Sequence, residues 1–294
     1  MQTFLLENDT LRATIRSKSA ELISIIKKET NVEYLWNGDA RYWNWTSPIL
    51  FPVVGMVRDK KYIYRDKSYP MSQHGFARDY EFELVSQTDN EIWFAFASSE
   101  ETRQIYPFDF RLEIGYRLEA GTIQVLWKVI NTDEKVLHFS IGAHPAFMCP
   151  LAGEGVQSDY YMGFETTVSE LKYKLIDPSC NLIAPQEHTL ALADGLHQIE
   201  KDRFDLDALV IEDHQTHKMW LAKPDKTPYV SVEFDTPLFG VWSPAKLDAP
   251  FICIEPWYGR SDGNYFYGTL EEREYGNTAA PGEVFERSYK INIL

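Results

Sequence analysis

Three isolated polar side chains lie in charge-poor stretches of the sequence and are suited to proton transfer. They are His74, His144 and Glu255, which stand in the stretches 73–78, 141–147 and 251–257. Burying a lone carboxylate in a run such as Ile-Cys-Ile-Glu-Pro-Trp is costly, so a glutamate at that position needs a reason. Ordinary pKa values near 6.5 for histidine and 4.3 for glutamate give an ionised base and a histidine that titrates near neutrality. Together the three residues predict general acid–base chemistry.

Each of these residues, taken singly, also has a structural interpretation. A histidine beside Pro145 is more often hydrogen-bonded scaffolding than a catalyst, and Glu255 on a strand could simply pair with Arg78. In a strand, Cys253 and Glu255 would share one face, because side chains alternate from face to face. The combination of two histidines and one glutamate moves the balance towards a catalytic site.

Other candidate residues carry weaker signals. His214 and His217 lie between the apolar runs 208–211 and 219–222, which predicts a hairpin turn there and no metal site. Asp207 stands where a strand is entered, so a turn acid and a ligand contact are equally good interpretations.

Three aromatic residues near the C-terminus could stack on the face of a sugar: Trp242, Trp257 and Tyr258. Core filling is the expected role for at least one of them.

Composition and motifs exclude several function classes. The net charge of −15 disfavours nucleic acid and anionic membranes as partners, while a small neutral substrate is not penalised. The three cysteines are far apart and odd in number, so they suggest neither a disulfide framework nor a CxxC metal site. No GxxxxGK[ST] or HExxH motif occurs, and Ser158 stands where a GxGxxG motif beginning at Gly153 would need glycine.

The elements that must position these residues are mostly strands. Apolar and polar residues alternate at 11–16, 112–117, 124–130 and 230–235, and polar or Gly/Pro breaks separate these runs. Only 99–106 and 270–275 have the pattern of short helices. Hydrophobic residues make up 44% and aromatic residues 14%, which suits a β-rich globular chain. We expect an all-β sandwich or barrel that forms one domain over residues 1–294.

The chain is expected to be cytoplasmic. The N-terminus has no basic region followed by an apolar one, and the charge-free stretch 42–57 is shorter than the roughly 20 residues of a membrane helix. The sequence leaves open whether the chain is a monomer or a homodimer.

An ordered set of motifs over nearly the whole chain resembles the aldose 1-epimerase family, the galactose mutarotase-like proteins, and most of all its bacterial LacX-like branch. The motifs are Phe-Pro-Val-Val-Gly at 51–55, Gln-His-Gly-Phe-Ala-Arg at 73–78, Gly-Ala-His-Pro at 142–145, Asp-Ala-Leu at 207–209, Gly-Val-Trp-Ser at 240–243 and Ile-Glu-Pro-Trp at 254–257. The resemblance implies a large twisted antiparallel β-supersandwich with few short helices.

The resemblance also implies an isomerase that interconverts the α and β anomers of a hexose. Glu255 resembles the family's general base for the anomeric hydroxyl, and His144 resembles the general acid for the ring oxygen. The ring opens, the C1–C2 bond rotates, and the ring closes on the other face with the roles reversed. His74 matches a second histidine near the ring oxygen, and Asp207 matches an acid that binds sugar hydroxyls. No metal and no organic cofactor is implied, and the partner is a small sugar.

Two positions bear on the substrate. Many relatives carry an arginine directly after the glycine that matches Gly55, whereas this chain has Met56, so Arg58 is the nearest substitute for a sugar contact. The run at 73–78 also resembles that of hexose-6-phosphate 1-epimerases, in which its arginine helps to hold phosphate. Arg78 would then favour a phosphorylated sugar, or it would be a structural partner of an acid.

Two further alternatives remain open. One is a non-catalytic carbohydrate-binding protein on the same sandwich, since a fold does not dictate function. The other is a glycosidase with Glu255 and Asp207 as paired carboxylates, which requires a carboxyl separation of about 5–9.5 Å.

Overall fold

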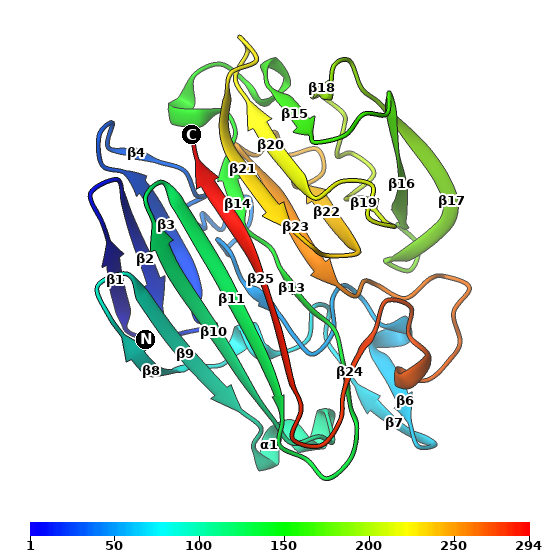
Figure 1. The fold of residues 1–294 in the computed structure, drawn as a ribbon. Coiled ribbons are helices and arrows are strands. Elements are labelled where there is room, and N and C mark those ends of the chain that lie inside the picture. Colours follow the sequence, from blue (N-terminus) through cyan, green and yellow to red (C-terminus); the bar gives the residue numbers. More distant parts are fainter.

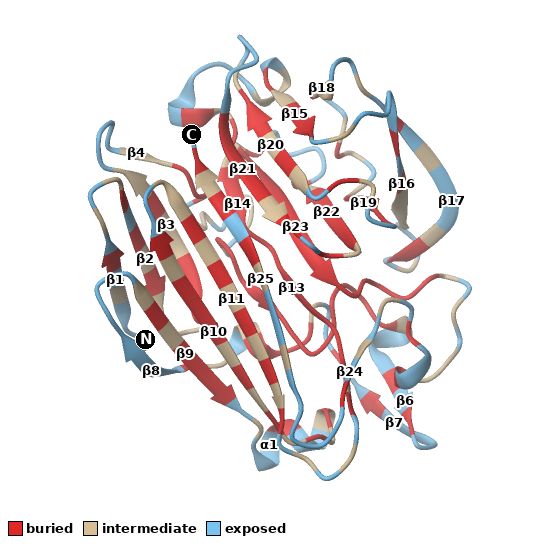
Figure 2. Cartoon of the chain, viewed as in Figure 1, coloured by how far each residue is buried: buried red, intermediate tan, exposed pale blue.

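Period-two alternation in the sequence becomes strands whose alternate side chains face the interior. In the computed structural model, which describes residues 1–294, strand β2 (Leu11–Arg16) buries Leu11, Ala13 and Ile15 and leaves the residues between them more exposed. Strand β11 (Thr122–Asn131) repeats this pattern over its whole length, as the alternating colours in Figure 2 show. The strands predicted from alternation are confirmed.

The largest sheet has nine strands and crosses the front of the molecule in Figure 1. All of its strand pairs are antiparallel. In spatial order its strands are β18 (Leu196–Gln198), β15 (Tyr161–Phe164), β20 (Lys218–Ala222), β21 (Pro228–Phe234), β25 (Val284–Ile293), β11, β10 (Phe110–Glu119), β9 (Glu91–Ala97) and β8 (Glu83–Gln87).

A second antiparallel sheet carries the residues of interest. In spatial order its strands are β17 (Leu182–Ala191), β16 (Glu170–Asp177), β19 (Leu209–Ile211), β22 (Leu238–Trp242), β23 (Phe251–Tyr258), β13 (Ile141–Ala143) and β5 (Ile49–Leu50), with β14 (Ala146–Met148) also paired to β23. Strand β23 is buried at all eight positions, which explains why its sequence is so poor in charge.

Smaller elements complete the fold. A four-stranded sheet at the N-terminus comprises β1 (Thr3–Glu7), β2, β3 (Glu21–Lys27) and β4 (Val32–Glu33), while β6 (Lys61–Tyr64) pairs with β7 (Lys67–Pro70) and β12 (Leu137–Phe139) pairs with β24 (Asn277–Ala279). Helical segments are short: α1 (Glu100–Ile105) and the 3₁₀ turns η1 (Arg58–Lys60), η2 (Ala77–Asp79), η3 (Leu151–Gly153), η4 (Gln157–Asp159) and η5 (Leu270–Glu272).

Of the two short helices expected from the sequence, one is an α-helix and the other is a single 3₁₀ turn. Helix α1 begins after Ser99, whose side chain and that of Thr102 form a capping box at its N-terminus. The stretch 270–275 forms only the single turn η5. No helix has both the length and the apolar character that a membrane crossing requires.

One predicted connection is wrong. The segment 212–217 was expected to be a hairpin turn, but β19 pairs with β16 and β22 whereas β20 pairs with β15 and β21. The segment therefore joins the two large sheets, and Thr216 holds it by donating a hydrogen bond to the Glu165 carbonyl.

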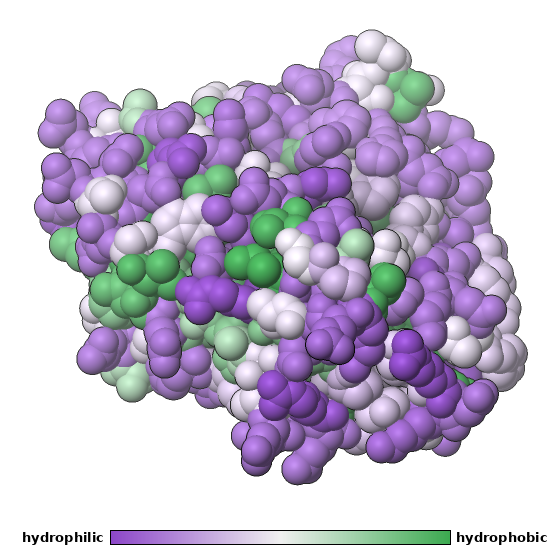
Figure 3. All heavy atoms as spheres, turned by 60° about the horizontal axis from the view of Figure 1, so that its bottom comes forward, coloured by the Kyte–Doolittle hydropathy of each residue, from purple (hydrophilic) through white to green (hydrophobic).

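One apolar cluster of 67 buried residues extends from Leu6 to Ile293 and includes side chains from both large sheets. This continuity supports our proposal that residues 1–294 form a single domain. The face in Figure 3 is covered mainly by hydrophilic residues, with apolar residues only in separate small groups, as a strongly charged chain requires.

Candidate active site

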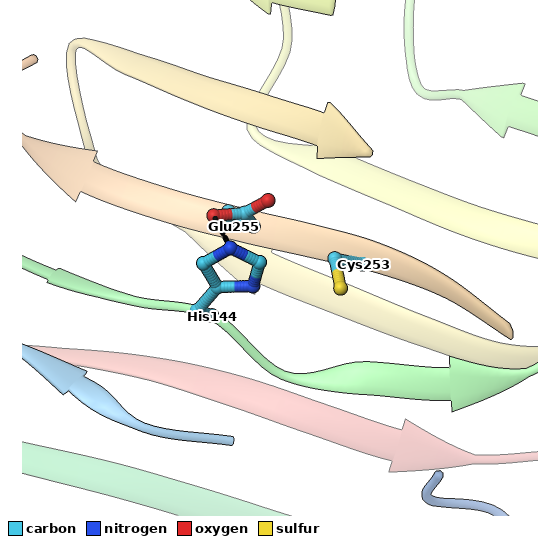
Figure 4. Close-up of side chains that lie close together, drawn as sticks. All are labelled: His144, Cys253 and Glu255. Carbon is cyan, nitrogen blue, oxygen red and sulfur yellow. Dashed lines mark ion pairs between the residues drawn. The ribbon is translucent and has the colours of Figure 1, made fainter. Parts of the chain in front are cut away.

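His144 and Glu255 meet because strand β23 pairs on both sides of the segment that carries the histidine. Gly142 of β13 lies opposite Trp257, and Ala146 of β14 lies opposite Cys253. The intervening segment therefore lies across β23 next to Glu255. His144 Nε2 is 3.2 Å from Glu255 Oε2, and only 8% and 1% of the two side chains are exposed (Figure 4).

Burial dominates the electrostatics of this pair. It raises the pKa of Glu255 well above its ordinary value, and the nearby charge of Asp207 adds to the rise while the Trp257 indole opposes it. Burial also lowers the pKa of His144 well below its ordinary value, helped by the neighbouring His74 and Arg78. The pair therefore holds one proton over a wide pH range, as an acid–base couple requires.

An aromatic wall lines His144. The Trp43 ring stacks on the imidazole with centroids 4.6 Å apart and planes at 30°, and Trp242 approaches it edge-on at 5.4 Å. Trp43 and Trp242 also contact each other at 5.6 Å. Both tryptophans are half-buried, so each is packed beside the pair while part of its side chain remains exposed.

His74 lies next to His144, with the two rings 5.5 Å apart and nearly perpendicular. The Gly55 N–H donates to His74 Nδ1 at 3.1 Å, which leaves the ring proton on Nε2 in the neutral form. Burial, with the positive charge of Arg78, lowers the pKa of His74 to about 3, so this neutral form prevails at physiological pH. His74 is therefore a hydrogen-bond donor held in one orientation.

Two glycines make the backbone around His74 possible. Gly55 and Gly75 have φ values of +69° and +73°. A Cβ at Gly75 would lie 2.1 Å from the Phe51 carbonyl oxygen, and a Cβ at Gly55 would lie 2.0 Å from Ser261 Oγ. Only glycine combines this conformation with such close approach.

Arg78 lies in η2 and borders the same site. Its Nη2 donates to the Gln73 carbonyl at 2.9 Å, and its guanidinium carbon is 5.5 Å from the centre of the Trp45 ring. It makes no ion pair with Glu255, whose ionic partner is His144. The interpretation of Glu255 as a simple partner of Arg78 is therefore wrong.

Asp207 stands just before β19, with φ of +76°. Its Oδ1 accepts a hydrogen bond from the Ala208 N–H at 2.7 Å, as a turn acid does. Its charge also contributes to the raised pKa of Glu255. Asp207 thus combines a local structural bond with a second carboxylate oxygen that remains available.

The structure does not bring Arg58 together with these residues. Its guanidinium donates hydrogen bonds to the carbonyls of Phe266 and Asn264, at 2.7 Å and 2.6 Å, and lies 4.1 Å from the Tyr267 ring centre. Its Nε and Nη2 thus donate to the loop carbonyls at 263–266, and a sugar contact by Arg58 in place of the arginine missing at Met56 stays a prediction.

Of the three aromatic residues that could stack on a sugar, two lie in the core and one lies at the site. Trp257 is buried, and a Cβ at Gly142 or Gly240 would lie within 2.6 Å of its ring, so the side chain fills the space over two neighbouring strands. Tyr258 is buried and donates to the Asp235 carbonyl. Trp242 is the one of the three that lies at the site.

Trp43 and Trp45 were not singled out from the sequence. Their signal was the Tyr-Trp-Asn-Trp run in the charge-free stretch 42–57, which is unusually aromatic for a loop. Two sets of side chains also have potential metal ligands close together: His144, Cys253 and Glu255, which are buried, and His214, His217 and Asp235, which are exposed.

The sequence comparison identifies the family of this chain. The aldose 1-epimerase family model matches residues 2–265. The chain belongs to the aldose 1-epimerase family. It is 31% identical over 300 residues to protein LacX (chromosomal) of Lactococcus lactis subsp. lactis, in an alignment that covers 99% of each chain. The resemblance inferred from the motifs is thereby confirmed.

Solved structures give the same result for the fold. A galactose mutarotase related enzyme from Lactobacillus acidophilus has a TM-score of 0.93 and 29% identity, covering 100% of this chain and 97% of that one. A galactose mutarotase-like protein from Lactobacillus casei has a TM-score of 0.92 and 29% identity, with 100% of both chains covered. The predicted all-β, galactose mutarotase-like fold is confirmed, and the family indicates an isomerase-type enzyme for a sugar.

Proposed function

We propose that this protein interconverts the α and β anomers of a hexose by general acid–base catalysis. The observation that carries the proposal is the buried His144–Glu255 couple, two titratable groups 3.2 Å apart in a family of aldose 1-epimerases. Apart from their contact with each other, the two groups leave polar atoms unsatisfied: buried His144 Nδ1 has no hydrogen-bond partner, and Glu255 Oε2 contacts nothing but His144 Nε2. Polar atoms without partners inside a protein are costly, so a polar ligand at this point would compensate them.

The couple supplies both proton transfers of ring opening. The reactive form of the pair is the one in which its single proton lies on His144 rather than on Glu255. In that form Glu255 takes the proton of the anomeric hydroxyl, and His144 gives a proton to the ring oxygen as the C1–O bond breaks. After rotation about C1–C2, the ring oxygen attacks the other face of the aldehyde and the protons return. Each turnover leaves one proton on the pair, so no proton is consumed.

His74 and Asp207 orient the sugar in this proposal. The Nε2–H of His74 would donate near the ring oxygen, because Gly55 already occupies its Nδ1. The carboxylate of Asp207 would accept hydrogen bonds from ring hydroxyls, since one of its oxygens makes no contact with the backbone.

The aromatic wall would hold the less polar face of the ring. Trp43 and Trp242 are half-buried beside His144, where indole surfaces can cover the C–H groups of a pyranose. This contact excludes water from the reacting atoms and strengthens the hydrogen bonds of the couple.

The test is anomer exchange followed by proton NMR. Freshly dissolved α-glucose and α-galactose are mixed with the protein, and the anomeric signals are followed against the uncatalysed rate. We expect faster exchange with the parent protein and a loss of about 10²–10⁴-fold in Glu255→Gln. Glu187→Gln, on an exposed glutamate, is the matched control and should keep the parent rate. Unchanged exchange in Glu255→Gln would reject this base, whereas sugar binding without exchange would favour a binding protein.

A second candidate, a hexose-6-phosphate 1-epimerase, is favoured by a group of cations around Trp45. Arg16, Lys18 and Arg78 each place their charge between 5.5 and 5.7 Å from the centre of this ring. Arg16 is paired with the buried Glu21, whereas Lys18 and Arg78 make no ion pair. In a chain with net charge −15, two unpaired cations together beside the site would favour an anionic group.

Substrate preference separates the two candidates. Exchange is compared for glucose and glucose 6-phosphate with the parent, Arg78→Ala and Lys18→Ala. The phosphate candidate predicts a higher kcat/KM for the phosphorylated sugar, and both substitutions should lower this value at least about tenfold more than the value for glucose. Lys201→Ala, on an exposed residue, is the control. Equal kcat/KM values for the two sugars in the parent would reject the phosphate candidate.

A further inference from the structure

Cys253 is a buried thiol that the proposed reaction does not use. It lies two residues before Glu255 on strand β23, so both side chains leave the same face of the strand. Figure 4 shows the sulfur on the same side of this strand as the His144 ring. One potential ligand atom from each of His144, Cys253 and Glu255 lies within 4.8 Å of the other two.

The donors in this group are not used by the rest of the protein. Glu255 Oε2 contacts only His144 Nε2, at 3.2 Å, and the other ring nitrogen of His144, Nδ1, has no hydrogen-bond partner. Cys253 forms no disulfide. An S, N and O set at one buried point that makes no hydrogen bond to the rest of the protein is unusual, because proteins satisfy nearly all buried polar atoms.

The spacing fits a tetrahedral cation. Zinc binds thiolate sulfur at about 2.3 Å and imidazole nitrogen or carboxylate oxygen at about 2.0–2.2 Å, which puts neighbouring ligand atoms about 3.3–3.7 Å apart. The His144–Glu255 contact of 3.2 Å is already close to this separation. The sulfur has to move by no more than about 1.5 Å, within the range of a change in side-chain torsion.

We propose that His144, Cys253 and Glu255 form a binding site for a borderline-soft divalent cation such as Zn²⁺ or Cd²⁺. Thiolate and imidazole ligands select such ions over Mg²⁺ or Ca²⁺, which prefer oxygen. On binding, the thiol proton passes to solvent and the sulfur coordinates as thiolate. The cation is an inhibitor and not a cofactor, since it occupies the proton-transferring atoms of the couple.

The exposed group of His214, His217 and Asp235 does not provide the same site. Its ligand atoms are also within 4.8 Å of one another, but it has no sulfur. His217 Nδ1 is engaged with the Phe234 carbonyl at 3.2 Å. A metal held there would lack a metal–thiolate bond. It would therefore show no sulfur-to-metal charge-transfer absorption, which distinguishes the two groups.

The experiment titrates the whole protein with Cd²⁺ and follows the sulfur-to-metal charge-transfer absorption, with stoichiometry from calorimetry. We expect one tight site with this absorption in the parent protein and in the control variants Cys180→Ser and His217→Ala. Cys253→Ala should abolish the absorption and weaken binding at that site at least about tenfold. Glu255→Gln should also weaken binding while retaining the sulfur signal at higher Cd²⁺ concentration.

Several outcomes would overturn the proposal: no charge-transfer absorption in the parent, absorption that persists in Cys253→Ala, or absorption that disappears in Cys180→Ser. Near-ultraviolet circular dichroism shows whether Cys253→Ala and Cys253→Ser keep the fold of the parent. Two different substitutions are made so that at least one variant without the thiolate is folded. Binding is measured without turnover and stands apart from the proposed function. Inhibition by the cation and displacement of Cd²⁺ by hexose both rest on that function, and the absence of displacement alongside normal Cd²⁺ binding would count against sugar at this site.

Discussion

Replacing Glu255 with glutamine should lower activity and raise stability at the same time. The carboxyl group is 1% exposed, its only ionic partner is His144, and burial raises its pKa well above 4.5. The folded protein therefore binds this proton more tightly than the unfolded chain does. The stability of the parent consequently falls as the pH rises above about 4.5, which is the sign that linkage requires for a raised carboxyl pKa.

The expected increase in the free energy of unfolding follows from the cost of burying the Glu255 carboxyl group. A buried polar group without full hydrogen bonding costs about 1–3 kcal/mol, and glutamine carries no charge that must be buried. We expect Glu255→Gln to be more stable than the parent by about 1–3 kcal/mol near pH 8.5 and by much less near pH 5.5. The assay is urea unfolding of both proteins at the two pH values, alongside anomer exchange.

Glu212 provides the matched control. It is also buried, but Lys174 at 2.7 Å and Arg260 at 2.5 Å both pair with it. Glu212→Gln leaves Lys174 without an ionic partner, whereas Arg260 keeps its contact with Glu274. The substitution should therefore destabilise the fold by about 3 kcal/mol, the low end of the range for breaking a buried ion pair. If Glu255→Gln is less stable than the parent at both pH values, or if the difference does not grow with pH, the reasoning about the buried carboxyl is refuted.

Three further predictions concern the same site. Trp43→Ala removes the ring stacked on His144 and should lower kcat for anomer exchange about tenfold with a smaller change in KM, measured by steady-state kinetics; an unchanged kcat would contradict a positioning role. Gly75→Ala should lose at least about 2 kcal/mol in urea unfolding, because its Cβ would meet the Phe51 carbonyl at positive φ, and parent-like stability would contradict the backbone argument. The pH profile of kcat/KM, corrected for uncatalysed exchange, should be bell-shaped, since activity is lost as the pH falls through the lowered pKa of His144 and as it rises through the raised pKa of Glu255. A rate that keeps increasing into alkaline solution would show that the pair does not need its single proton.

The residues of the site could be predicted from the sequence because they break a local pattern. Glu255 stands in a strand that is otherwise apolar, and His144 stands between two short buried strands. Such exceptions are visible without coordinates, since burial of a charge needs a compensating function. The contacts of Arg58 could not be predicted in this way, because nothing local shows that carbonyls of a loop some 200 residues away accept hydrogen bonds from its guanidinium.

The residue pattern alone was enough to predict the four alternating strands, their buried faces and the three chemical groups, since alternation of side chains follows from the backbone of each strand. Strand β11 shows this at every position. The identity of neighbouring strands came from the packing of the whole chain: the segment 212–217 passes from one sheet to the other, and Trp43 stacks on His144. Contacts of this kind join residues far apart in the chain and depend on how the whole core packs, so no local pattern encodes them.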